Sequence, residues 1–435
     1  MTSTSTQRHA AHRTIDAERW PDVATAPGPS ARAAIARGLF TTGVAKLPLR
    51  VRFPDERMIG AGGPAAPIMV LHRPRDFFRR LGASGLIGFG ESYMAGDWDS
   101  ADLTGVLTVF AANVGDLVPP WQQRLRQLAV RRHPSDDQQT REGARRNIGR
   151  HYDLSNELFA LFLDETMTYS AAVFGTGPDG APVAPDPEPD PDPIAAASML
   201  AAAQHRKIDL LLDRAGVGPG CRVLEVGTGW GELALRAARR GASVVTITIS
   251  AEQQALAVRR VAEAGLASQI SVQLRDYRDI DGKFDAICSV EMLEAVGERY
   301  WDAYFTALDA HLAPGGRVGL QTITMGHERM LATRRTYTWI HKYIFPGGLL
   351  PSVTAIENSL ARSTRLRITA RDDFGAHYAE TLKIWRDRFS AYSGEVERLG
   401  FDEVFRRMWS FYLSYSEAGF RAGYIDVSQL TLARI

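Results

Sequence analysis

The feature that most constrains the fold is a glycine-rich turn between an apolar run and a helical pattern. Residues 223–231 read VLEVGTGWG. The apolar run predicts a buried strand, and Gly227 and Gly229 let the backbone turn tightly and let a ligand approach the start of the next helix. The spacing departs from both G-x-G-x-x-G and G-x-x-x-x-G-K-[ST], and Trp230 stands where a pyrophosphate needs bare backbone. The turn therefore predicts a ligand site that is not built for a dinucleotide or a nucleoside triphosphate.

Strand and helix patterns alternate along the chain on both sides of this turn. Strand patterns occupy residues 221–227, 243–250, 270–276, 284–291 and 315–324. Helical patterns occupy residues 230–241 and 251–266, between the first three strands. Such an order predicts an α/β fold with a doubly wound parallel sheet and helices on both faces. The last hundred residues predict further helices at 377–400 and 405–426, each with an aromatic face.

The second strand limits the choice of ligand. It ends in TITIS, without the acid that clasps a dinucleotide ribose, so a nicotinamide or flavin cofactor is disfavoured. An acid-x-Gly-x-Gly turn suits S-adenosylmethionine, which has no phosphate and whose amino acid end and ribose hydroxyls bind backbone and polar side chains. A turn that serves packing alone is the alternative.

Composition narrows the class of protein. The chain has 435 residues, of which 45% are hydrophobic, and this suits two or three globular domains. Its formal net charge of +1 gives no overall attraction to nucleic acid. A secretory signal core and a membrane-spanning run are both absent from the sequence pattern, which predicts a cytoplasmic protein. Cys221 and Cys288 lack metal-ligand spacing and are expected to be buried reduced thiols, so no metal site is predicted.

Changes in composition and hydrophobic pattern along the chain predict its domains. Residues 1–30 are polar and expected to be disordered. Residues 31–145 predict a smaller α+β domain, with strands at 51–56 and 66–72 and a helix at 102–114. The main α/β domain is expected at 146–435.

Two segments have an unusual composition. Residues 175–195 are rich in proline and aspartate and predict an exposed loop. Residues 121–151 are rich in arginine. They fit a solvated linker helix or a face that meets anionic lipid headgroups, and RNA binding is disfavoured because aromatic residues are scarce.

Several blocks together resemble the cyclopropane-fatty-acid synthase and mycolic acid methyltransferase family. They read HYDLSNELFALFLDETMTYS, VLEVGTGWG, TITISAEQQ, LRDYRDIDGKFDAICSVEMLEAVGERYW, KYIFPGGLLPS, HYAETLKIWRDRF and YLSYSEAGFRAGYID, in family order across residues 151–435. GFGESYMAGDWDS, at residues 88–100, resembles the N-terminal domain of the phospholipid-acting members. The resemblance implies a class I S-adenosylmethionine-dependent methyltransferase, Rossmann-like, that methylates a carbon–carbon double bond in a lipid acyl chain.

The same resemblance implies positions for the cofactor-binding residues. By the matching motifs, the methionine end of the cofactor lies near Tyr169 and Ser170, and the floor beneath it is formed by Glu225, Gly227 and Gly229. The ribose lies near Thr248 and Gln253, and the adenine lies near Tyr277 and Arg278.

Cyclopropane-forming members of this family hold a bicarbonate ion as a base, and the resemblance also indicates its ligands. Three family positions are retained as Glu294, Tyr412 and Ile323. Three others differ, as Ala171 in YSAAVF, Gln321 in LQTIT and Ala295 in MLEAVG. Bicarbonate binding is therefore placed in doubt, because losing polar ligands from a buried anion site costs about 1–3 kcal/mol each.

The reacting end of the site needs charge and aromatic groups, since methylation of an alkene leaves a carbocation. Glu294 is the first candidate for a charged group near the cation, and Tyr412 is the second. His377, with Tyr378, is a candidate for the wall of the acyl tunnel. Structural roles are the alternatives: a paired carboxylate, aromatic packing and a buried core histidine.

Two products stay open at this point. Proton loss with ring closure gives a cyclopropane. The departures at Ala171 and Gln321 instead resemble the actinobacterial methyltransferases of 10-methyl fatty acid synthesis, which act on oleoyl phospholipids and give a 10-methylene chain. That resemblance implies a separate flavin-dependent reductase as partner and a peripheral position on the inner face of the membrane. A soluble small-molecule methyltransferase and a non-catalytic lipid-binding scaffold are the rivals, and a homo-oligomer is compatible with the sequence.

Overall fold

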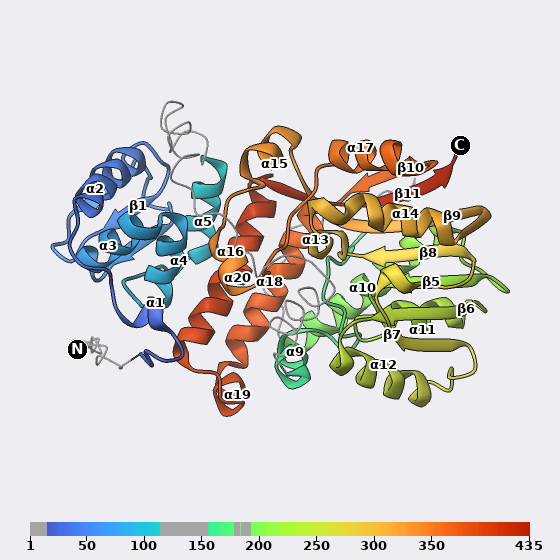
Figure 1. Ribbon diagram of the computed structural model, residues 1–435. Coiled ribbons are helices and arrows are strands. Elements are labelled where there is room, and N and C mark those ends of the chain that lie inside the picture. Colours follow the sequence, from blue (N-terminus) through green and yellow to red (C-terminus); the bar gives the residue numbers. More distant parts are fainter. Residues whose placement is uncertain (1–14, 114–154, 178–182, 184–192) are drawn as a thin grey trace. The chain divides into compact units, whose positions relative to one another are not determined.

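The computed structural model describes residues 15–113, 155–177, 183 and 193–435 (Figure 1). The chain divides into two compact units. Residues 1–106 together with 402–411 form the first unit, and residues 107–401 together with 412–435 form the second. The predicted domain border near residue 145 lies outside the described residues, so it stays a prediction.

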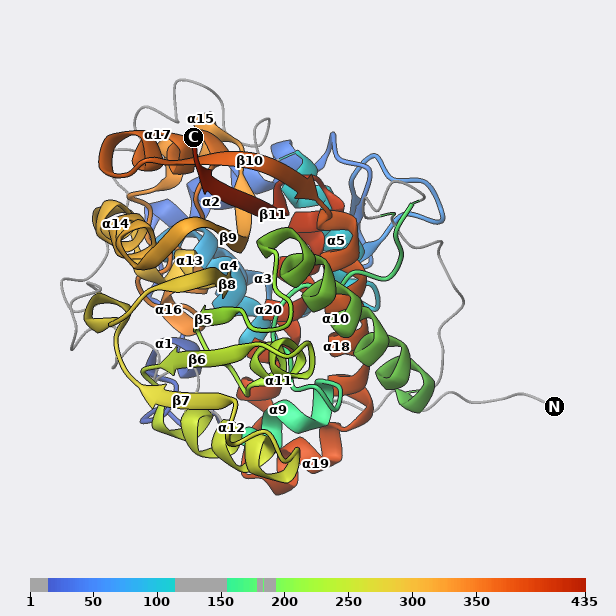
Figure 2. The same ribbon diagram turned by 90° about the vertical axis from the view of Figure 1, so that its right-hand side faces the viewer.

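A seven-stranded sheet forms the centre of the second unit (Figure 2). Its strands, in spatial order, are β10 (Leu366–Asp373), β11 (Ile425–Arg434), β9 (Leu312–Met325), β8 (Phe284–Val290), β5 (Arg222–Val226), β6 (Ser243–Thr248) and β7 (Ile270–Leu274). The five strands β5 to β9 run parallel, whereas β11 is antiparallel to β9 and β10 is antiparallel to β11.

Helices cover both faces of this sheet. Three helices, α10 (Pro193–Ala215), α11 (Glu232–Arg239) and α12 (Ala251–Glu263), bury one core against it. Two others, α14 (Trp301–His311) and α17 (Val353–Ser363), bury a second core on the opposite face. The predicted doubly wound α/β fold is confirmed.

The two antiparallel strands were not predicted. In β11 the run Val427–Thr431 is fully buried although three of its five residues are polar. These polar side chains find partners on neighbouring strands and helices, as Gln429 does on Gln321 and Lys207. A buried strand of this kind lacks the apolar run from which sequence reasoning recognises a central strand.

Further helical elements belong wholly or partly to the second unit. They are α9 (Asn156–Phe162), η2 (Tyr277–Asp279), α13 (Leu293–Val296), η3 (Glu298–Tyr300), α15 (His327–Thr333), α16 (Trp339–Tyr343), α18 (Gly375–Ala391), α19 (Ser393–Arg398) and α20 (Glu403–Arg421), the last of which contributes residues to both units. The Ser155 hydroxyl accepts a hydrogen bond from the Leu158 backbone and caps α9.

The first unit is a small α+β structure, as predicted. Its sheet has the order β2 (Met58–Ile59), β1 (Arg50–Arg52), β3 (Ile68–Leu71) and β4 (Trp98–Asp99). The helices of this part of the chain are α1 (Pro21–Ala24), α2 (Ala31–Val44), α3 (Pro74–Ser84), α4 (Leu86–Met94) and α5 (Leu103–Ala112). Inside it the guanidinium of Arg80 pairs with Asp97 and donates to the backbone of Asp22 and Val23.

Several expectations are corrected or fall outside the description. Residues 15–30 were expected to be disordered, but they include α1, and Val23 is buried because Arg80 ties this segment to the core. Cys288 is buried as predicted, whereas Cys221 is partly exposed at the edge of β5. The arginine-rich stretch 121–151 and most of the loop 175–195 lie outside the described residues. Among the described helices, none has the length and apolar character to cross a membrane.

Candidate active site

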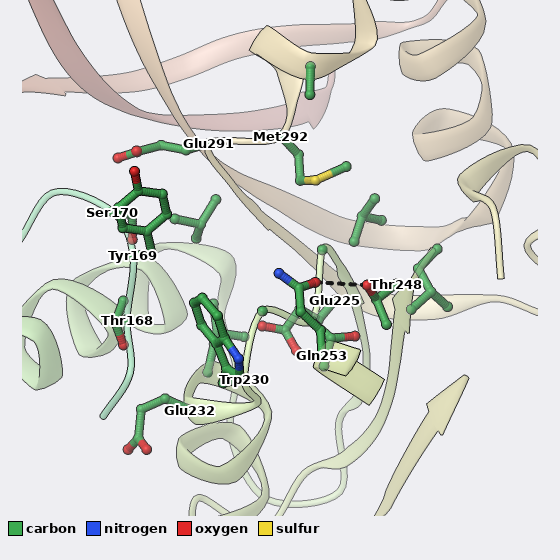
Figure 3. Close-up of a pocket in the computed structure, with 18 of the residues that line it drawn as sticks. Thr168, Tyr169, Ser170, Glu225, Trp230, Glu232, Thr248, Gln253, Glu291 and Met292 are labelled. Carbon is green, nitrogen blue, oxygen red and sulfur yellow. Dashed lines mark hydrogen bonds between the residues drawn. The ribbon is translucent and has the colours of Figure 1, made fainter. Parts of the chain in front are cut away.

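A pocket lies at the carboxyl ends of β5, β6 and β8, where a doubly wound sheet binds its ligands (Figure 3). All nine residues predicted to bind the cofactor line it. They are Tyr169, Ser170, Glu225, Gly227, Gly229, Thr248, Gln253, Tyr277 and Arg278. The sequence therefore located this pocket residue by residue, although segments more than a hundred positions apart build it.

The glycine turn shapes the floor of the pocket. Gly227 has φ +101°, and the backbone N–H groups of Gly227 and Thr228 both donate to the carbonyl of Ile247. A Cβ atom on Gly227 would lie 2.5 Å from Cγ of Met292, so a side chain there would collide with the pocket wall. Trp230 is one of the residues that line the pocket (Figure 3). Its indole N–H donates to Asn156 on α9, which fixes the ring in the pocket wall.

Glu225 supplies a buried acceptor at the end of β5. Its Oε2 atom has no hydrogen-bond partner among the described residues. Burial raises the pKa of Glu225 to about 8, against the opposing effects of Thr246 and Lys207. A buried acceptor without a protein donor fits a ligand that brings one, such as the amino group or ribose hydroxyls of S-adenosylmethionine. The residues present therefore fit this cofactor.

Polar groups also lie at the positions that the resemblance predicts beside the ribose and the adenine of the cofactor. The hydroxyl of Thr248 donates to Oε1 of Gln253 at 2.9 Å, which fixes the amide so that its NH₂ group remains as a donor (Figure 3). Arg278 makes two hydrogen bonds to Asp276, at 2.7 and 2.6 Å. Arg278 thus orients Asp276, a pocket residue that sequence reasoning missed.

A buried lysine was also missed. Lys207 lies on α10, is 1% exposed and donates to the hydroxyl of Ser170 at 2.8 Å. Burial lowers its pKa to about 8, although Glu291, Asp164 and Glu225 act in the opposite direction. The signal in the sequence is a lysine on a helix face that is apolar apart from Gln204, which is also buried.

Aromatic side chains gather beside the methionine end of the pocket. The hydroxyl groups of Tyr169 and Tyr412 are 2.7 Å apart. This aromatic cluster, defined by neighbouring ring pairs with centroids 4.5–6.2 Å apart, consists of Tyr169, Phe345, Tyr378, Trp385, Tyr412 and Phe420. Aromatic faces attract cations, so this surrounding suits a cationic intermediate.

Glu291 stands between the pocket and the aromatic cluster, and sequence reasoning did not single it out. It follows β8 with φ +51°, a left-handed conformation that costs a non-glycine residue about 1 kcal/mol. Oε1 accepts the Ala171 backbone N–H at 3.0 Å and the Gln321 amide at 2.9 Å. Oε2 accepts the Tyr378 hydroxyl at 2.7 Å. Ala171 and Gln321 stand at two positions that the resemblance assigns to the bicarbonate ligands. In this chain both donate hydrogen bonds to the Glu291 carboxylate.

The three residues predicted for the reacting end and its acyl tunnel, Glu294, Tyr412 and His377, have different placements. Tyr412 reaches the pocket through Tyr169. Glu294 does not line the pocket: its Oε1 accepts the Ile323 backbone N–H at 2.5 Å and the Thr322 hydroxyl at 3.0 Å. Burial, followed by the nearby Glu291, raises the pKa of Glu294 to about 8. Its Oε2 atom is buried and has no hydrogen-bond partner among the described residues, so Glu294 stays a candidate for the reacting end.

His377 is buried on α18 and does not line the pocket. Its Nδ1 accepts the backbone N–H of Phe174 at 3.0 Å, and burial, followed by Arg206, lowers its pKa to about 4. An uncharged histidine with this bond anchors the segment that follows Tyr169 and Ser170. The structure therefore does not bring His377 to the reacting end.

The fold and the pocket define a class I S-adenosylmethionine-dependent methyltransferase. The family model described as mycolic acid cyclopropane synthetase matches residues 139–430. The chain belongs to this family, and the methyl-group donor is S-adenosylmethionine.

Curated relatives extend over most of the chain. The tuberculostearic acid methyltransferase UfaA1 of Mycobacterium tuberculosis is 54% identical over 423 residues, which cover 97% of this chain and 96% of the relative. The cyclopropane-fatty-acyl-phospholipid synthase of Escherichia coli is 35% identical and covers 85% of this chain and 89% of its own length.

Solved structures agree with this assignment. The cyclopropane synthase MmaA2 from Mycobacterium tuberculosis superposes with a TM-score of 0.57 and 31% identity, over 67% of this chain and 98% of that one. The mycolic acid cyclopropane synthase CmaA1, complexed with SAH and CTAB, gives 0.57 and 32%, over 66% and 97%.

Proposed function

We propose that this enzyme methylates the double bond of oleoyl chains in phospholipids and releases a 10-methylene acyl chain. A separate flavin-dependent reductase then converts the methylene group to the 10-methyl branch. The observation that carries the proposal is the 54% identity, along nearly the whole chain, to a protein named for tuberculostearic acid methylation. The substrate is a membrane lipid, so we also propose that the enzyme works at the inner membrane surface.

The residues of the pocket bind and orient the methyl donor. When bound, S-adenosylmethionine supplies an electrophilic methyl group. The glycine turn and Glu225 hold the floor of the site, and the Thr248–Gln253 pair offers hydrogen bonds on one side. Placement of the reacting carbon within about 3–3.5 Å of its partner accounts for much of the rate enhancement in such reactions.

The aromatic cluster stabilises the positive charge that develops on the acyl chain. Methylation at carbon 10 leaves a positive charge on carbon 9, and the ring of Tyr169, which lines the pocket and stacks on Trp385, lies where it attracts that charge. Buried aromatic surroundings also exclude water, which would otherwise quench the cation. A hydride shift from carbon 10 to carbon 9 moves the charge to the methylated carbon. Proton loss from the new methyl group then leaves a methylene group on carbon 10.

A transfer assay tests the substrate class. The enzyme is incubated with methyl-labelled S-adenosylmethionine and vesicles of dioleoyl-phosphatidylglycerol, with distearoyl-phosphatidylglycerol as the matched control. We expect label in the lipid fraction with dioleoyl vesicles and at least about 100-fold less with the saturated lipid, because only an alkene offers π electrons to the methyl group. Equal labelling of both lipids, or labelling of neither, would contradict a methyltransferase that acts on acyl double bonds.

A further inference from the structure

Four carboxyl groups line the described part of the pocket: Glu225, Glu232, Asp276 and Glu291. The reaction needs one proton acceptor at the aromatic end. Glu232 forms an ion pair with Arg260 at 2.8 Å, and Asp276 forms one with Arg278 at 2.6 Å, so each of these carboxylates already has a cationic partner. Glu225 lies on the floor of the turn, at the end of β5. Only Glu291 among these four bonds to a member of the aromatic cluster, Tyr378.

We propose that the Glu291 carboxylate is the base of this enzyme and accepts the proton that the methylated acyl chain loses. The protein thereby supplies from its own chain the anion for which a dissolved bicarbonate would otherwise be needed. This inference rests on the proposed function, since it names the base of that same reaction.

The hydrogen bonds around Glu291 favour its ionised form. A backbone N–H and an amide NH₂ group can only donate, and both point at Oε1. The orientation of the Gln321 amide is fixed by a chain of bonds. The amide nitrogen of Gln429 donates to the carbonyl of Lys207 and to Oε1 of Gln321, which leaves Nε2 of Gln321 to face Glu291.

These bonds oppose the effect of burial. Burial raises the pKa of Glu291, whereas the bonds from Ala171, Tyr378 and Gln321 and the charge of Lys207 lower it. On balance the pKa of Glu291 is raised, so its carboxylate is a stronger base than one in water, and this suits removal of a proton from a carbocation.

The backbone at Glu291 indicates that its side chain is kept for a purpose. Its φ of +51° is a conformation that glycine adopts without strain. The backbone N–H of Glu291 donates to the carbonyl of Gln321, which holds the residue in this conformation beside its amide partner. Strain of this type is found where a side chain must point into a functional site.

The proton transfer balances without a further reactant. The carbocation carries the charge on the methylated carbon. A C–H bond of the new methyl group breaks, its electron pair becomes the π bond of the methylene group, and the proton bonds to an oxygen of Glu291. The carboxylic acid returns its proton to water after the product leaves, and the cycle consumes no oxidant or reductant.

The test compares three proteins in CO₂-free buffer with and without added bicarbonate: the wild type, Glu291→Gln and Glu291→Gly. Lipid product from dioleoyl-phosphatidylglycerol vesicles is measured by mass spectrometry, and S-adenosylmethionine binding by calorimetry. We expect wild-type turnover to be insensitive to bicarbonate. Both variants should lose at least about 100-fold in product formation, the usual contribution of a general base, while they bind the cofactor within about threefold of the wild type.

The glycine variant gives a second, independent result. Its backbone accepts φ +51° without strain, so it should fold, and its missing carboxylate opens space for a small anion. Added bicarbonate should restore about 10-fold or more of its activity and should leave Glu291→Gln unchanged. Glu263→Gln, an exposed carboxylate at the end of α12, is the control and should match the wild type.

Several results would overturn the proposal. These are full activity of Glu291→Gln, dependence of the wild type on bicarbonate, or loss of cofactor binding in parallel with activity, which would indicate a structural role. A wild type that forms a cyclopropane, with the same loss in Glu291→Gln, would contradict the proposed product and support Glu291 as the base. A wild type that transfers no methyl group to lipid would overturn both.

Discussion

Replacement of Gly227 by valine should weaken S-adenosylmethionine binding by at least about 100-fold, which corresponds to about 2.8 kcal/mol. Two effects add at this position. The residue has φ +101°, which a β-branched residue does not adopt without strain, and a Cβ atom would lie 2.5 Å from Cγ of Met292. Relief of the collision would move Met292 or the turn, and both line the cofactor pocket. Isothermal titration calorimetry measures the loss.

The matched control for this variant is Gly229→Ala. Gly229 also has a positive φ, +50°, but no atom lies within 4 Å of a Cβ placed on it. Only the left-handed strain remains, about 1–2 kcal/mol for a non-glycine residue, so the loss in affinity should be about 30-fold or less. Similar affinities for Gly227→Val and the wild type would show that the turn does not form the cofactor floor.

Replacement of Lys207 by methionine should destabilise the second unit by about 3–5 kcal/mol, the usual cost of removing one member of a buried charged group. Lys207 is 1% exposed, and its ammonium faces the carboxyl groups of Glu291, Asp164 and Glu225. Methionine fills a similar volume, so the loss reflects charge rather than a cavity. The free energy of unfolding in urea, measured at pH 7 without cofactor, tests this.

A second substitution should recover part of this loss. Glu225→Gln removes one of the facing carboxyl groups, so the double variant should be more stable than Lys207→Met alone by about 1 kcal/mol or more. Lys46→Met, at an exposed position, is the control and should change stability by no more than about 0.5 kcal/mol. An unchanged unfolding curve for Lys207→Met would contradict the charged cluster described for the pocket.

The sequence allowed the sheet and the cofactor pocket to be predicted because their signals are local. The run 223–231 contains a strand, a turn and a helix start, and each is recognisable from neighbouring residues. Thr248 and Gln253, which the family resemblance indicated, lie at the end of β6 and in the first turn of α12, and strand ends of a parallel sheet converge at one edge.

The reacting end could not be predicted in the same way. The partners of Glu291 are Ala171, Gln321 and Tyr378, at separations of 120, 30 and 87 residues, and no local pattern connects them. The strand β11, which brings Gln429 beside Gln321, has a polar buried centre and was not predicted. Conversely, His377 matched a motif by sequence, but packing turns it towards the backbone of Phe174.

The central claim is that the enzyme forms a methylene chain rather than a ring, and proton NMR of the product tests it most directly. The protein is incubated with S-adenosylmethionine and dioleoyl-phospholipid vesicles in the absence of any reductase, and the fatty acids are recovered. Mass does not distinguish the two products, because they are isomers. We predict vinylidene protons in the spectrum. Upfield cyclopropane protons in their place would contradict the account and identify a cyclopropane synthase.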